Sequence, residues 1–344
     1  MRAWHSELDM RLAVHGDDFT VLGSGCSLDK FREYVNTCTQ VKFKARIGGA
    51  GKEATRILNR VVQDTKEGLE YEADQRHAEI VIRDMGLKAD SKGVGTPGLP
   101  DLAVLAMQVP AGCDETKYRA MAARVNYLSQ DRPDIQYAVK EVCRKMSQPD
   151  KEDWAKIKML ARYLKEYPRM VQKLEALDMP KDLEVWVDTD FAGCRRTRKS
   201  TSGGMVMLGS HLLKSWSTTQ DAVALSSGEA EFYGIVEGAT QGIGMRSLLA
   251  DMGLQVGIKV MTDSSAAVGT VHRRGAGRVR HLEVRDMWVQ DKIAKGEFSV
   301  HKVKGKEDVA DILSKYMDEA SLGMTLQWIV LARRRGRHDL NPGI

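Results

Sequence analysis

Cysteine is scarce in this chain of 344 residues, which contains five cysteines, at positions 26, 38, 113, 143 and 194. No two of them form a CxxC pair, and an odd number does not complete a disulfide framework. The spacing argues against the common zinc motifs and against a small disulfide-rich secreted domain. It favours a reducing compartment.

Long apolar runs are also missing. No stretch of 18 apolar residues occurs, so no membrane-spanning helix is expected. The first residues, MRAWHSELDM, lack the apolar core of a secretory signal. Aromatic residues are sparse at 6%, whereas the 29% of charged residues is ordinary for a soluble globular protein. We expect an intracellular protein large enough for two domains, with the cytoplasm and the nucleus both open.

Basic residues are present but unevenly placed. Residues 272–306 contain ten Lys or Arg against four Asp or Glu, an excess larger than the net charge of +5 of the whole chain. A second basic cluster, RRTRK, occupies residues 195–199. Such clusters suit a polyanion such as nucleic acid, and a solvated helix face is the alternative.

The first half of the chain divides at residues 86–112, which contain five glycines and three prolines and predict a break between packed regions. Before it, RLAVHGDDFTVLG predicts a hairpin, and LDKFREYVNTC predicts an amphipathic helix. LEYEADQRHAEIVIRDMG predicts a further strand and helix. After the break, residues 114–170 have mostly helical spacing, for example at Ile135, Val139, Val142 and Met146.

From residue 182 the pattern changes to short strands. LEVWVD, GGMVMLGS, LLKSWST and AVALSS are strand-like, and SGEAEFYGIVEGATQGIGMRSLLADMG predicts a long helix. GIKVMTD and EFSVHKVKG predict further strands, alternating with helices in SSAAVGTV, HLEVRDMWVQDKIAKG and EDVADILSKYM. The order predicts an α/β fold, a mixed sheet covered by helices.

Carboxylates follow two of these strands. Asp188 ends the first strand and Asp263 ends GIKVMTD, so parallel pairing of the two strands would bring both acids to one sheet edge. In the long helix, Ser226-x-x-Glu229 matches a capping box, which leaves Glu231 free to project. Asp311 lies off the apolar stripe of the last helix, near its start.

Each of these four acids also has an ordinary explanation, as a helix cap, a turn residue or a solvated side chain. Together they would repel one another unless a cation compensates their charge. Mg²⁺ is the natural candidate because it prefers oxygen ligands that phosphates can share. Two such ions, about 3.5–4 Å apart, activate a water and stabilise the leaving oxygen of a phosphodiester.

The ordered motifs DTDFAG, TRKSTSGG, SWSTTQDAVALSSGEAEFYG, TDSSAA, RHLEVRDMWVQDKIAKGE and VADILSK resemble the ribonuclease H domain of copia-type retrotransposon Pol polyproteins. Upstream, VHGDDFTVLG, VGTPG, YLSQDRPDIQYAVKEVCRKMSQP and ARYLKEYP resemble the end of the same polyprotein's reverse transcriptase. The resemblance covers roughly residues 11–318.

This resemblance implies a ribonuclease H-like mixed sheet with flanking helices, preceded by a truncated α+β palm. The expected domains are a palm remnant (1–112), a helical connection (113–180), a ribonuclease H-like domain (181–320) and a basic C-terminal tail (321–344).

The resemblance also implies a function, the hydrolysis of the RNA strand of RNA–DNA hybrids with two Mg²⁺ ions, for which Mn²⁺ is the substitute. The implied partners are the hybrid and the rest of a Pol polyprotein. The loop VKGKED lacks the histidine of many cellular ribonucleases H, which we interpret as a matter of rate and product release. The implied catalytic and metal-binding residues are Asp188, Glu231, Asp263 and Asp311, with Asp190 in a supporting role. The candidates for phosphate contact, from charge and position, are Arg196, Arg198, Lys199, Arg278 and Arg280.

The upstream half departs from the family. The tyrosine-x-Asp-Asp motif of the polymerase is replaced by His15-Gly16-Asp17-Asp18, and the chain begins just before this hairpin. Asp17 and Asp18 are therefore predicted to be vestigial polymerase residues, and polymerase activity is not expected. The alternatives to an active ribonuclease are a decayed product that only binds nucleic acid and a related nuclease that acts on DNA.

Overall fold

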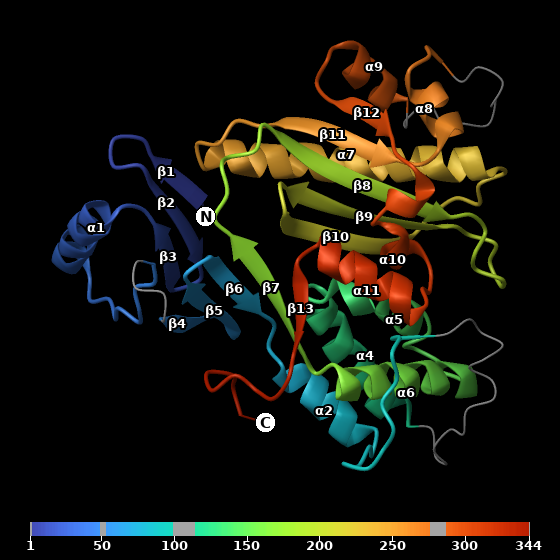
Figure 1. The fold of residues 1–344 in the computed structure, drawn as a ribbon, viewed down its shortest axis with the longest axis horizontal. Coiled ribbons are helices and arrows are strands. Elements are labelled where there is room, and N and C mark those ends of the chain that lie inside the picture. The colour runs from blue at the N-terminus through green and yellow to red at the C-terminus, as the bar shows by residue number, and fades with distance from the viewer. Residues whose placement is uncertain (1, 49–52, 99–113, 276–286, 344) are drawn as a thin grey trace.

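The predicted fold class, a mixed α/β protein with helices flanking its sheets, is confirmed. A computed structural model describes residues 2–48, 53–98, 114–275 and 287–343. They form three β-sheets, with the largest helices packed around the central one (Figure 1). Within these residues, no helix combines the length and the apolar character that a membrane span requires.

The central sheet has the strand order β10-β9-β8-β11-β12. Its strands are β8 (Asp182–Asp190), β9 (Thr201–Leu208), β10 (His211–Thr219), β11 (Gly257–Thr262) and β12 (Ser299–Lys302). β8, β9 and β10 pair antiparallel, whereas β11 is parallel to both β8 and β12. The carboxyl ends of three strands therefore meet at one edge. The prediction of a strand in AVALSS was wrong, because these residues form bends that lead into the next helix.

Two separate apolar cores lie on the two faces of this sheet. Leu183, Val185 and Val187 point to one core, and Trp186, which alternates with them, points to the other. The first core is shared with α7 (Ser227–Asp251), α8 (Ser265–Val271) and α9 (Trp288–Ala294). The second is shared with α4 (Glu115–Ser129), α5 (Pro133–Cys143), α6 (Lys151–Glu166) and the short α10 (Asp311–Ser314). The predicted helical region 114–170 is thus packed directly on the sheet.

The N-terminal sheet contains the predicted hairpin. Its strands are β1 (Arg2–His5), β2 (Met10–His15) and β3 (Asp18–Leu22), followed by α1 (Gly25–Cys38). Gly16 has φ +61 at the first position of the two-residue loop, where a type II′ turn places glycine. The Arg11 Nε donates a hydrogen bond of 3.0 Å to the Met252 carbonyl at the end of α7. A cation at a helix C-terminus is favourable, and this contact joins the hairpin to the central layer.

The third sheet joins segments from both ends of the chain, in the order β13-β7-β6-β5-β4. Residues after 320, which we expected to form a basic tail, instead continue a helix and then add strand β13 antiparallel to β7. The apolar side chains of Leu322, Leu326 and Leu331 are buried and hold this segment in place. The elements are β4 (Ala54–Ile57), β5 (Arg60–Thr65), β6 (Gly68–Glu72), α2 (Arg76–Asp84), β7 (Arg169–Glu175), α11 (Glu319–Trp328) and β13 (Leu331–Arg334).

Candidate functional site

Asp188 and Asp263 lie side by side at the edge where the parallel strands end. Asp188 is near the end of β8, and Asp263 directly follows β11. Met261 pairs with Trp186, so the same register places Asp263 next to Asp188. The parallel pairing on which this proximity was predicted is therefore confirmed.

Asp308 joins these two acids, although it was not among the residues predicted from the sequence. One carboxylate oxygen each of Asp188, Asp263 and Asp308 lies within 4.8 Å of the other two. Asp308 follows a single 3₁₀ turn, η2 (Gly305–Glu307), and its Oδ1 accepts a hydrogen bond of 3.0 Å from the Ala310 N–H. The position of Asp308 could have indicated this. It follows β12, which is parallel to β11, so the carboxyl end of β12 lies at the same sheet edge as those of β8 and β11.

Glu231 reaches the same cluster from α7, which packs on the sheet face opposite to α10. Its side chain is 8% exposed, and burial, with Asp188 and Asp263 adding repulsion, raises the pKa of Glu231 to about 9. Glu229 has the predicted structural duty: its N–H donates to the Ser226 Oγ at 3.2 Å. Its Oε2 accepts from the Leu225 N–H at 2.7 Å rather than from the cap residue itself, so the capping box is shifted by one residue.

Asp311 lies next to the cluster but is held by a lysine. Its Oδ1 is 2.6 Å from the Lys315 Nζ, which is also 3.7 Å from the Asp188 Oδ2. Burial and Asp188 raise the pKa of Asp311 to about 6, and Lys315 opposes that rise. Asp188 also accepts a hydrogen bond from the Ser314 hydroxyl. The helix that carries Asp311 is shorter than predicted, since α10 covers only four residues.

Few positive charges lie near the five carboxylates of this cluster, and two of the carboxylate oxygens lack a hydrogen-bond partner in the described structure. The five are Asp188, Glu231, Asp263, Asp308 and Asp311. Burial, Asp188 and Asp311 raise the pKa of Asp308 to about 8. Among the described residues, the Glu231 Oε2 and the Asp308 Oδ2 have no hydrogen-bond partner although both are buried. Buried polar atoms without partners are costly, and an oxygen-only donor set is what a hard divalent cation such as Mg²⁺ prefers. The residues present therefore fit such an ion.

A glycine on β9 allows α10 to approach the site. Gly203 pairs with Asp188 across β8 and β9. A Cβ atom at Gly203 would lie 2.6 Å from the Leu313 carbonyl carbon and 2.8 Å from the Ser314 nitrogen, both backbone atoms. The absence of a side chain at Gly203 thus lets Ser314 and Lys315 reach Asp188.

Gly203→Ala is expected to destabilise the protein by about 1–3 kcal/mol, because α10 must move away from the sheet. The measurement is urea unfolding followed by circular dichroism. Gly269→Ala is the matched control: it lies in α8 with nothing within 4 Å of its added Cβ, so it should be neutral or stabilise by up to about 1 kcal/mol. Equal stability of the two variants would show that α10 is not held against Gly203.

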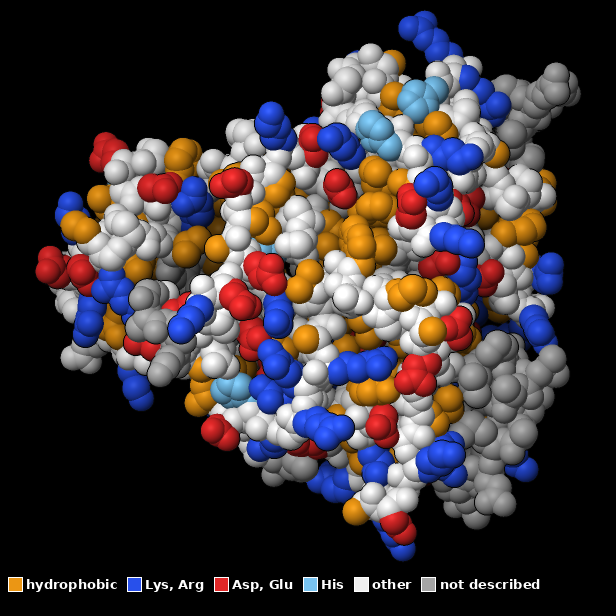
Figure 2. Space-filling model, in the orientation of Figure 1, with side chains coloured by type: hydrophobic (Ala, Val, Ile, Leu, Met, Phe, Trp, Pro, Cys, Tyr) orange, Lys and Arg blue, Asp and Glu red, His pale blue; other side chains and the backbone are white. Residues whose placement is uncertain are grey.

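The predicted phosphate-contact residues are only partly within the described structure. Arg196, Arg198 and Lys199 lie in the loop between β8 and β9, next to the carboxylate edge, whereas Arg278 and Arg280 lie outside the described residues. Figure 2 shows Lys and Arg side chains around α8, α9 and β12 with Asp and Glu among them. Several of these charges are paired locally, for example Lys292 with Glu297 at 2.7 Å. Part of the positive charge on the described residues of this segment is therefore paired with neighbouring acids.

Asp17 and Asp18, the predicted vestigial polymerase residues, lie at the hairpin between β2 and β3. Asp17 is exposed, and Asp18 pairs with Lys44 at 2.7 Å. Within the described part of the chain, neither belongs to a group of three metal-ligating side chains.

No protein-family model matches the chain. The chain is similar to the "Retrovirus-related Pol polyprotein from transposon TNT 1-94" of Nicotiana tabacum, with 27% identity over 275 residues, or 76% of this chain and 20% of that protein. It is 32% identical over 161 residues to the "Uncharacterized mitochondrial protein AtMg00810" of Arabidopsis thaliana, covering 46% of this chain and 64% of that protein. Among solved structures, LC11-RNase H1 in complex with RNA/DNA hybrid is 14% identical with a TM-score of 0.28, covering 38% of this chain and 93% of that one. The chain thus spans a fifth of the first curated relative and less than two thirds of the second.

Proposed function

We propose that the chain is a fragment of a copia-type retrotransposon Pol polyprotein and acts as a ribonuclease of the ribonuclease H type. Its similarity to retrovirus-related Pol polyproteins of plant transposons supports this proposal. The proposed reaction is the endonucleolytic hydrolysis of the RNA strand of an RNA–DNA hybrid, dependent on Mg²⁺ or its substitute Mn²⁺. The observation that carries the proposal is the convergence of Asp188, Asp263 and Asp308 with the buried Glu231 at one sheet edge. Two buried oxygens of that group, the Glu231 Oε2 and the Asp308 Oδ2, have no hydrogen-bond partner among the described residues, which supports a cation-binding role for them.

The proposed roles follow from the positions of the side chains. Asp188, Glu231, Asp263 and Asp308 would hold the divalent ions, with Asp311 beside them. When bound, the ions would supply an activated water and stabilise the oxygen that leaves phosphorus. Lys315 pairs with Asp311, lies 3.7 Å from the Asp188 Oδ2, and would also attract the phosphate of the substrate. Asp190, two residues beyond Asp188, would support this arrangement.

The proposed substrate is recognised through its backbone and shape. Ribonucleic acid in a hybrid presents 2′-hydroxyls and phosphates across a wide minor groove, which a protein contacts without sequence preference. The side chains proposed for this are those of the β8–β9 loop, with Arg278 and Arg280 as further candidates.

The division of the chain stays a prediction: a palm remnant (1–112), a helical connection (113–180) and a ribonuclease H-like domain (181–320). We propose no polymerase activity, because the motif tyrosine is replaced by His15. Positioning by several metal ligands is what phosphoryl transfer requires.

The proposal is tested by incubating the purified chain with a labelled RNA–DNA hybrid and Mg²⁺. We expect cutting of the RNA strand that stops in EDTA and in the Asp263→Asn variant. Binding without cutting would instead favour a decayed product that only binds nucleic acid. Cutting of duplex DNA in a parallel reaction would favour a DNA nuclease.

A further inference from the structure

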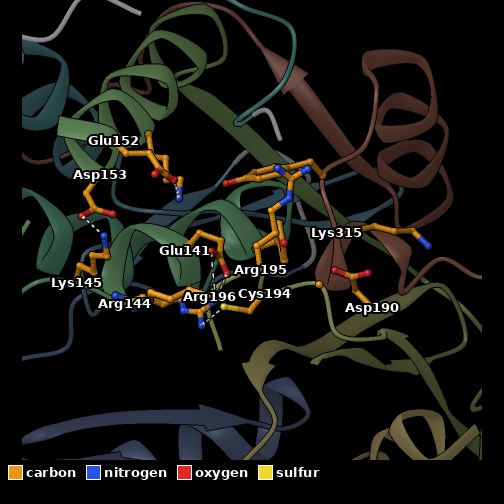
Figure 3. A pocket seen from close by; sticks show the side chains of 14 residues that line it. Glu141, Arg144, Lys145, Glu152, Asp153, Asp190, Cys194, Arg195, Arg196 and Lys315 are labelled. Carbon is orange, nitrogen blue, oxygen red and sulfur yellow. Dashed lines mark hydrogen bonds and ion pairs between the residues drawn. The ribbon is translucent and has the colours of Figure 1, made fainter. Parts of the chain in front are cut away.

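A pocket of about 550 Å³ lies beside the carboxylate cluster, between the helical region and the β8–β9 loop (Figure 3). One wall consists of residues of α5, of the turn after it and of the first turns of α6; Arg144 and Lys145 belong to the turn. The opposite wall is the loop after β8, including Arg195 and Arg196. The pocket therefore combines side chains from two parts of the fold that are far apart in the sequence.

The pocket has an excess of positive charge. Six Lys or Arg residues line it against four Asp or Glu. Three of the acids are already paired with lining cations: Glu141 with Arg144 at 3.2 Å, Glu152 with Lys156 at 2.7 Å and Asp153 with Lys145 at 3.6 Å. Arg195 and Arg196 are exposed and form no ion pair with any residue that the structure describes. These two guanidinium groups are left to bind an external anion.

The pocket continues from the carboxylate cluster. Asp190 and Lys315 lie together at one end of it, and Lys145 lies at the other (Figure 3). Lys315 is 3.7 Å from the Asp188 Oδ2, so the same side chain borders both the pocket and the proposed metal site. A nucleic-acid strand with its scissile phosphate at Asp188 would enter the pocket at this end.

The wall also contains two aromatic rings. Tyr137 of α5 and Tyr316, which follows Lys315, meet edge to face with their centroids 4.7 Å apart, and both line the pocket. Basic side chains interleaved with aromatic rings are typical of single-strand binding surfaces, because phosphates pair with the cations and bases contact the rings.

We propose that this pocket binds the continuation of one strand of the nucleic-acid substrate beyond the cleavage site. Helices α5 and α6 then form part of the substrate surface and do more than support the sheet. The proposal rests on the proposed function, which supplies the strand at Asp188. The ligand class is a nucleic-acid strand, recognised by its phosphates and by the faces of its bases.

The experiment measures binding of a fluorescein-labelled RNA–DNA hybrid with a single-stranded extension to the full chain by anisotropy, in EDTA, over a series of salt concentrations. Two double variants test the two walls: Arg195→Gln with Arg196→Gln in the loop, and Lys145→Gln with Lys156→Gln in the helices. Each is expected to weaken binding about tenfold. The loop variant should lower the salt slope by about 1 for each lost phosphate contact, and the helical variant leaves Glu152 and Asp153 without their cations, so that they repel the strand. Lys30→Gln with Lys42→Gln is the matched control: it removes the same charge from exposed positions in and after α1, and wild-type binding is expected.

The helical lysines are paired with acids, so Lys145→Arg with Lys156→Arg is included; it keeps the charge and should keep wild-type binding. Wild-type affinity and salt slope in the folded helical Gln variant would overturn the proposal. Failure of the proposed function is seen separately, as a wild-type chain that binds the hybrid and does not cut it. In that case the anisotropy series still decides whether the pocket binds the strand.

Discussion

Asp188→Asn is expected to lower the rate of hybrid cleavage by about 10³-fold or more, because bound metal contributes several kcal/mol of transition-state stabilisation at about 1.4 kcal/mol per decade. Asp188 is the acid whose charge acts on each of the other acids of the cluster. It repels Glu231, Asp263 and Asp308, and it is within reach of Ser314 and Lys315. Asparagine keeps the shape of the side chain and removes its charge, so the loss would be electrostatic.

The control for Asp188→Asn is Asp182→Asn, the same substitution at the start of the same strand. Asp182 is partly exposed and pairs with Lys259 at 2.7 Å, a type of ion pair that contributes about 0–1 kcal/mol. Its cleavage rate should stay at the wild-type value. Mg²⁺-dependent thermal stabilisation provides a second readout, expected to be lost in Asp188→Asn only. Wild-type cleavage by Asp188→Asn would remove the carboxylate cluster from the mechanism.

The second large effect concerns the pH dependence of stability in the absence of metal. Burial raises the pKa of Glu231 to about 9 and that of Asp308 to about 8, from ordinary values of 4.5 and 3.8. Between the ordinary and the raised values, the folded chain binds more protons than the unfolded chain, so the free energy of unfolding falls as pH rises. We expect the melting temperature in EDTA to decrease by roughly 5 °C or more between pH 5 and pH 9.

Mg²⁺ should reverse most of this decrease, since a bound cation favours the ionised carboxylates and binds only the folded site. The diagnostic comparison is the difference in melting temperature between the wild type and each of Glu231→Gln and Asp308→Asn. Both variants should be more stable than the wild type at pH 9 in EDTA and should gain less from Mg²⁺. A melting temperature in EDTA that rises from pH 5 to pH 9, or variants that follow the wild-type curve, would contradict the description of the site.

Much of the architecture was predictable because it depends on neighbours in the sequence. The alternation of Leu183, Val185 and Val187 marks a strand whose two faces meet different cores. The Gly16-Asp17 loop marks the hairpin, and the spacing of Ile135, Val139 and Val142 marks a buried helix face. The capping pattern identified Glu229 as the structural residue and left Glu231 for the site. This too was predictable, because caps and turns are local arrangements of backbone donors.

What only the tertiary structure decided is which distant residues are close in space. Asp311 was singled out by its place on a predicted helix, but the chain turns at η2, so Asp308 joins Asp188 and Asp263 while Lys315 pairs with Asp311. The periodicity of the sequence did not predict two further features. Leu331–Arg334 pairs with β7, and a pocket lies between α5, α6 and the β8–β9 loop. Short-range patterns specify where strands and helices form, whereas the packing of their side chains over long sequence separations determines which carboxylates, cations and rings meet.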